Sequence, residues 1–94
     1  MKRILIVEDQ PDIRKLIRMT LEFENYEIYE ADDGVSALEL VASMRPDLIL
    51  LDVMMPGELD GLQVCNRIKS DPATAHCKVV LLSARGHAKD LEAG

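Results

Sequence analysis

The stretch Leu48-Ile49-Leu50-Leu51-Asp52-Val53-Met54-Met55-Pro56-Gly57 decides the fold. Its four consecutive apolar residues lie between two aspartates. This favours a strand buried on both faces, because a half-exposed strand would alternate apolar with polar residues. Such a strand is typical of a parallel sheet. Since a Pro-Gly turn follows, we expect the Asp52 carboxylate at the carboxyl end of a central strand, where open α/β sheets place their ligand crevice.

Three other segments are predicted as strands. Residues 4–7 and 78–82 are almost wholly apolar, which again favours interior parallel strands. Residues 26–31 mix polar and apolar side chains on both faces, the pattern of a strand near a sheet edge. Helical segments separate the strands, and this alternation indicates a doubly wound α/β domain with a parallel sheet.

Apolar residues at helical spacing mark the expected inward face of each helix. The expected helices span Pro11 to about Phe23, the Asp32-Asp33-Gly34 turn to Pro46, Leu62 to Ser70, and Arg85 onward. The residues expected to face inward are Ile13, Leu16, Ile17, Thr20 and Leu21 in the first helix, Val35, Leu38 and Val41 in the second, Leu62, Cys65 and Ile68 in the third, and Ala88 and Leu91 in the last.

The composition is that of one small globular domain. The chain has 94 residues, 48% hydrophobic and 30% charged, which suits a modest core. The net charge of −6 argues against direct binding of nucleic acid and against acidic membrane surfaces. No segment is long enough to span a bilayer, and Cys65 and Cys77 lack metal-ligand spacing. We therefore expect a cytoplasmic protein with reduced thiols.

Polar residues gather where the interior strands end. Glu8 and Asp9 close the first strand, Asp52 closes the third and Ser83 closes the fourth. Because the carboxyl ends of neighbouring parallel strands meet at one edge, these residues are expected to converge. Carboxylates packed so closely repel one another unless a cation neutralises them, and oxygen-seeking Mg²⁺ fits this cluster.

Each of these residues also has a local interpretation. Glu8 and Asp9, together with Asp12, could be favourable acids in the first turn of a helix, Asp52 a turn residue, and Ser83 a helix cap. These local roles do not predict that the four residues of the cluster fall at the same end of three interior strands. The shared position therefore favours a functional site.

Over its whole length, the chain resembles the receiver domain of bacterial two-component response regulators. The resemblance rests on Ile4 to Asp9, on Asp52 to Gly57 with Asp60-Gly61 following, and on Val79 to Ala84. It implies the flavodoxin-like strand order 2-1-3-4-5. It also implies a regulatory phosphoacceptor domain, not an enzyme, acting in phosphorelay signal transduction.

The resemblance assigns a role to each site residue. Asp52 would accept a phosphoryl group from a phosphohistidine of a sensor histidine kinase or phosphotransfer protein. Glu8, Asp9, Asp52 and the main-chain carbonyl of Met54 would hold Mg²⁺, and Ser83 would be the switch hydroxyl. An alternative function is a receiver-like interaction or assembly module that is not phosphorylated. A nucleotide-binding or flavin-binding protein is a distant third, because the acidic residues 8–12 lack the glycines of a phosphate cradle.

The family pattern continues with a fifth strand that ends on a lysine, and with a fifth helix. We therefore expect residues 1–94 to form a receiver domain that is incomplete at its C-terminus, with strand order 2-1-3-4. The strand Lys78 to Leu82 would then be an edge that has the composition of an interior strand. Self-association, or pairing with a completing chain, is expected through this edge.

Overall fold

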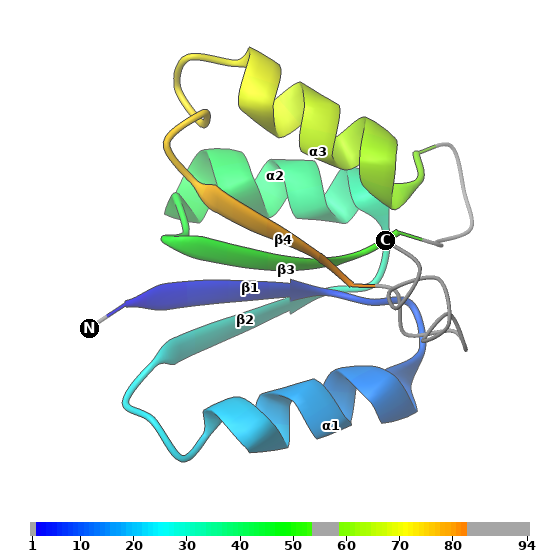
Figure 1. The fold of residues 1–94 in the computed structure, drawn as a ribbon, viewed down its shortest axis with the longest axis vertical. Coiled ribbons are helices and arrows are strands. Elements are labelled where there is room, and N and C mark those ends of the chain that lie inside the picture. The colour runs from blue at the N-terminus through cyan, green and yellow to red at the C-terminus, as the bar shows by residue number, and fades with distance from the viewer. Residues whose placement is uncertain (1, 54–58, 83–94) are drawn as a thin grey trace, which may run out of the picture.

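A computed structural model of the chain describes residues 2–53 and 59–82. Within these residues, four parallel strands form one sheet, in the order β2-β1-β3-β4 (Figure 1). The strands are β1 (Arg3–Val7), β2 (Glu27–Ala31), β3 (Leu48–Asp52) and β4 (Lys78–Leu82). This arrangement confirms the predicted flavodoxin-like α/β fold with order 2-1-3-4 and the predicted edge position of β2.

Three helices in the described part of the chain cover the sheet. Helix α1 (Pro11–Leu21) lies on one face, and α2 (Gly34–Met44) and α3 (Gly61–Ser70) lie on the other (Figure 1). Helix α1 ends two residues before the expected Phe23. The helix expected from Arg85 lies outside the described residues. Within the described part of the chain, no helix is long and apolar enough to cross a membrane.

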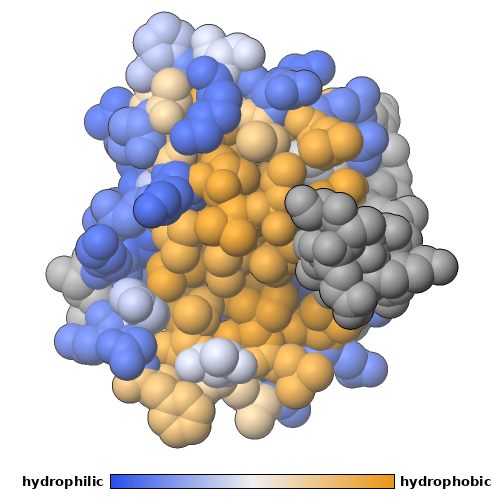
Figure 2. Space-filling model, viewed as in Figure 1, coloured by the Kyte–Doolittle hydropathy of each residue, from blue (hydrophilic) through white to orange (hydrophobic). Residues whose placement is uncertain are grey.

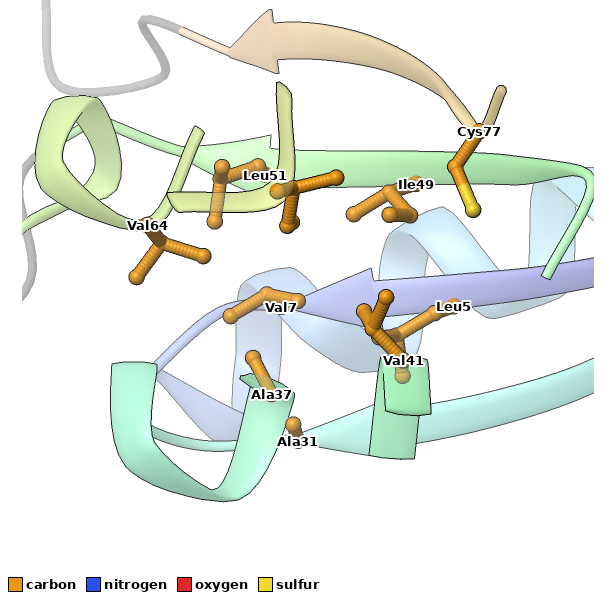
Figure 3. Close-up of a cluster of buried hydrophobic side chains, with 10 residues drawn as sticks. Leu5, Val7, Ala31, Ala37, Val41, Ile49, Leu51, Val64 and Cys77 are labelled. Atoms are coloured by element: carbon orange, nitrogen blue, oxygen red, sulfur yellow. The ribbon is translucent and has the colours of Figure 1, made fainter. Parts of the chain in front are cut away.

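The principal core lies between the sheet and helices α2 and α3. Leu5 pairs with Ile49 and Val7 with Leu51, so these four side chains share one face of the sheet. They are fully buried against residues of α2 and α3, as Figure 3 shows. The core cluster consists of Leu5, Val7, Ala31, Ala37, Val41, Ile49, Leu51, Val64, Ile68 and Cys77.

In α2 and α3, the first residue expected to face inward was predicted wrongly. Val35 and Leu62 are 47% and 53% exposed, whereas Ala37, Val41, Val64 and Ile68 are buried. A step of three residues falls about 60° short of a full helical turn, so two such steps rotate a side chain by roughly 120°. Steps that alternate between three and four residues keep to one face, and the buried residues of both helices follow that spacing.

The molecule also carries exposed apolar surface. Figure 2 shows a broad hydrophobic area over the middle of the face seen in Figure 1. On α1, Leu16 and Thr20 were expected to face inward but are exposed, Leu16 by 63%, and Met19 is exposed as well. Phe23, two residues after the end of α1, is also exposed. These residues line a surface hollow of about 430 Å³. On β4, Val80 and Leu81 are exposed, because β4 pairs with β3 and with no other strand among residues 2–53 and 59–82.

Candidate metal centre

Three carboxylates meet at the carboxyl edge of the sheet. Glu8 and Asp9 follow β1, and Asp52 ends the neighbouring β3, in which Leu51 pairs with Val7. One carboxylate oxygen from each of the three residues lies within 4.8 Å of the others. The expected convergence of Glu8, Asp9 and Asp52 is therefore observed, while the roles of these residues stay a prediction.

Two of the three acids are removed from solvent. Glu8 and Asp52 are 0% exposed, and Asp9 is half-buried. Burial raises the pKa of Glu8 above its ordinary value of 4.5, and the side chain of Asp9 and the charge of Asp52 act in the same direction. The main-chain N–H of Gln10 opposes this shift by donating a 3.0 Å hydrogen bond to Glu8 Oε2. The negative charges of the three carboxylates therefore repel one another, and a bound cation would reduce this repulsion.

The backbone just after Asp52 is held on two sides. The N–H of Val53 donates to the carbonyl of Leu82 at 3.1 Å, and the N–H of Gly61 donates to the carbonyl of Val53 at 3.0 Å. A Cβ atom at position 61 would lie 2.2 Å from the carbonyl oxygen of Asp52 and 2.6 Å from Val53 Cα. Only glycine therefore lets the start of α3 approach the end of β3 this closely.

Arg14 of α1 also reaches the site, and no motif in the sequence indicates this. Its Nη1 donates a 2.8 Å hydrogen bond to the main-chain carbonyl of Glu8, and its Nε donates a 2.8 Å hydrogen bond to Glu30 Oε1 on β2. The N–H of Glu8 donates to the carbonyl of Ala31 at 3.0 Å. The main chain of Glu8 is thus anchored at both its N–H and its carbonyl.

The donor set fits a hard divalent cation. Mg²⁺ is held through carboxylate oxygens together with water, and it keeps several of its waters. Glu8, Asp9 and Asp52 offer three such oxygens close together, two of them on buried side chains. Two residues that the sequence assigned to the site, Met54 and Ser83, lie outside the described residues.

Comparison with known proteins identifies the family. The response regulator receiver domain model matches residues 4–94. The chain is 41% identical over 90 residues to the DNA-binding dual master transcriptional regulator RpaA of Synechocystis, covering 96% of this chain and 37% of that protein. It is 49% identical over 82 residues to response regulator PleD of Caulobacter vibrioides, covering 87% of this chain and 18% of that protein. The chain thus spans well under half the length of these curated relatives.

Solved structures agree with this match. The N-terminal domain of a response regulator receiver protein from Methanoculleus marisnigri JR1 superposes with a TM-score of 0.84 at 39% identity, covering 90% of this chain and 68% of that one. The receiver domain of a sensor histidine kinase from Pseudomonas aeruginosa PAO1, described with magnesium in its active-site cleft, has a TM-score of 0.83 at 28% identity, covering 97% of this chain and 74% of that one. The chain therefore belongs to the response regulator receiver domain family.

Proposed function

We propose that this receiver domain accepts a phosphoryl group on Asp52 in a Mg²⁺-dependent reaction. Receiver domains of response regulators are phosphoacceptors in phosphorelay signalling and receive phosphate from histidine kinases. The donor for this chain is a phosphohistidine of a sensor kinase or of a phosphotransfer protein in the cytoplasm. The observation that carries the proposal is the meeting of Glu8, Asp9 and Asp52 at one edge of the sheet.

Asp52 is the nucleophile of the proposed transfer. One of its carboxylate oxygens forms the new P–O bond as the P–N bond of the phosphohistidine breaks, and the electron pair stays with the imidazole. Glu8, Asp9 and Asp52, together with the main-chain carbonyl of Met54, would hold Mg²⁺. When bound, the ion would supply positive charge that offsets the repulsion between the carboxylate and the phosphoryl oxygens.

The signal then depends on a change around the modified residue. A phosphoryl group adds charge and acceptor oxygens to Asp52, and the Ser83 hydroxyl donates a hydrogen bond to one of them. Ser83 follows β4 directly in the sequence, and Leu82 at the end of β4 pairs with Asp52. This register supports the assignment of Ser83 as the switch hydroxyl.

Intact-mass measurement after incubation with Mg²⁺ and a small acyl phosphate tests the proposal. We expect the mass to rise by one phosphoryl group, and we expect no rise in Asp52→Asn or in the presence of a chelator. Asp32→Asn is a matched control, because Asp32 is an exposed acid near the same edge that contributes nothing to the three-acid cluster.

Calorimetric titration of the same proteins separates metal binding from phosphoryl transfer. Asp52→Asn should bind Mg²⁺ more weakly than the wild type, because one of the three carboxylates is lost. Equal Mg²⁺ affinity in the two proteins, or phosphoryl labelling that survives Asp52→Asn, would show that the site has been assigned wrongly.

A second candidate function is assembly through the edge of β4, and one observation favours it. Val79, Val80, Leu81 and Leu82 carry no charge, proline or bulge, although natural edge strands usually have such protection. Val80 and Leu81 are each 40% exposed. We propose that a second copy of the chain pairs here, in which case the domain would associate whether or not it is phosphorylated.

A further inference from the structure

Arg14 bridges two parts of the chain that come together beside the acidic cluster. Its guanidinium donates to the carbonyl of Glu8 through Nη1 and to Glu30 Oε1 through Nε, both at 2.8 Å. The rigid planar fork of arginine can hold two acceptors at fixed positions, whereas the single ammonium group of a lysine cannot reproduce that arrangement. Arg14 therefore ties the loop after β1 to strand β2.

The carbonyl that Arg14 holds belongs to the peptide unit that joins Glu8 to Asp9. Because a peptide unit is planar, fixing its oxygen fixes the plane from which both acidic residues extend. The N–H of Glu8 is bonded to Ala31 of β2, so β2 supports the main chain of Glu8 on one side and Arg14 supports it on the other. Two of the three carboxylates of the cluster thus extend from a peptide unit whose oxygen Arg14 holds.

The charge of Arg14 needs a partner in this position, because an isolated cation would oppose the binding of a metal ion nearby. Glu30 supplies that partner. Its pKa is lowered: burial pushes it upward, but hydrogen bonds from Arg18 and Arg14 together outweigh that effect. Glu30 is therefore an anion at neutral pH and offsets the guanidinium charge.

We propose that Arg14 is a positioning residue for the acidic site: its guanidinium locks the peptide between Glu8 and Asp9 to Glu30 of β2, and so sets the affinity for Mg²⁺. This inference rests on the proposed function. Residues that orient metal ligands without touching the metal commonly change metal affinity by about 10–100-fold when they are replaced. Arg14 would act in this way through the main chain of its ligands.

Arg18 provides a matched control on the same helix. It bonds to the same Glu30 through Nη1, and its other ion pair is with Glu22, so it does not touch Glu8. Arg18→Lys replaces this guanidinium and so tests the surface ion pair with Glu30 alone. Surface ion pairs contribute little to stability, so Arg18→Lys should fold as the wild type does.

The experiment is a calorimetric Mg²⁺ titration of the full chain as wild type, Arg14→Lys, Arg14→Ala and Arg18→Lys. We expect both Arg14 variants to bind Mg²⁺ roughly tenfold or more weakly, with Arg18→Lys unchanged. If Arg14 acted only as a repelling charge, Arg14→Ala would bind Mg²⁺ more tightly and Arg14→Lys would match the wild type. Either of these results would overturn the proposal.

Two further readouts keep the inference separate from folding and from the proposed function. The Arg14–Glu30 pair borders a surface cavity of about 270 Å³, so its charge is screened by salt, whereas the orientation of a peptide is not. The weaker binding of Arg14→Lys should therefore persist in about 0.5 M KCl. Glu30→Gln is a second variant that removes the other anchor, and it should also weaken Mg²⁺ binding.

The Mg²⁺ titration of the wild type shows whether the positioning role of Arg14 or the proposed function has failed. Mg²⁺ binding by the wild type with no change in Arg14→Lys and Glu30→Gln would refute the positioning role and leave the proposed function standing. A wild type without measurable Mg²⁺ binding would overturn both. Circular dichroism of each metal-free variant establishes that the compared proteins are folded.

Discussion

Glu8 is a buried carboxylate that lies beside two others. Because burial and these neighbours raise its pKa above 4.5, the folded protein binds a proton there more tightly than the unfolded chain does. Without a metal ion, the contribution of Glu8 to the free energy of unfolding is therefore greatest below pH 4.5. It declines as the pH rises from 4.5 through the raised pKa.

We expect Glu8→Gln to raise the melting temperature of the metal-free protein at neutral pH, because it removes a buried charge and keeps the shape of the side chain. This gain should shrink as the pH falls toward 4.5, and Mg²⁺ should stabilise the variant less than the wild type. Thermal unfolding with and without Mg²⁺ measures both effects, with Glu39→Gln on the exposed surface of α2 as a control. A metal-free Glu8→Gln protein less stable than the wild type at neutral pH would contradict the expectation.

The sequence revealed some residues of the site and not others. Glu8, Asp9 and Asp52 could be grouped because each follows an apolar run, and the ends of parallel strands share one edge. Arg14 could not be found in this way, since it bonds to a main-chain oxygen and to a residue of a separate strand. The role of Gly61 was also hidden, because it depends on its close approach to the backbone of Asp52.

At the scale of elements, the start of α3 is fixed by a capping box. Asp60 accepts a hydrogen bond from the N–H of Gln63, and the Gln63 side chain accepts one from the N–H of Asp60, both at 2.9 Å. This box places Gly61, the first residue of α3, against the end of β3. The cap therefore stabilises both the helix and its contact with the site.

We expect Asp60→Ala to lower the free energy of unfolding by about 1 kcal/mol, because the N–H of Gln63 loses its acceptor. Asp60→Ser is the matched control: its hydroxyl can still accept the bond, so its stability should stay close to that of the wild type. Urea unfolding of the three proteins gives the comparison. Equal stability of Asp60→Ala and Asp60→Ser would mean that the cap contributes nothing.

The positions of helices and strands along the sequence were easier to predict than the faces that the helices bury. β1, β3 and β4 were found because short apolar runs bounded by acids and turns leave few alternatives. The Asp32-Asp33-Gly34 turn was expected before the second helix, and within it the Asp33 carboxylate accepts a hydrogen bond from the N–H of Ser36 at 2.8 Å. The faces of α2 and α3 were misjudged at Val35 and Leu62, because a spacing of three residues drifts around a helix.

At the scale of the whole molecule, the exposed edge and the exposed apolar face bear on self-association. A charge at Val80 should interrupt pairing along β4, since this side chain is 40% exposed and lies in the middle of the edge strand. We expect Val80→Lys to shift the protein toward monomer and to leave its circular dichroism unchanged. Sedimentation velocity at micromolar concentration measures the shift.

Leu62→Lys is the matched control for this prediction. It adds the same charge at a 53% exposed leucine of α3, away from the β4 edge, and it should leave the association state as in the wild type. The prediction fails if the wild type is itself a stable monomer. It also fails if both substitutions disperse the protein equally, because the effect would then come from net charge.

The strand order determines how long β1 stays unpaired while the chain is being synthesised. β1 is made first, yet it lies between β2 and β3 in the sheet, and its second neighbour is complete only when Asp52 has been added. At about 5–20 residues per second, a ribosome needs roughly 2–9 s to travel from Glu8 to Asp52. Throughout that interval at least one side of β1 is unpaired. Slow codons between β1 and β3 would therefore lengthen the time for which the nascent chain is open to aggregation.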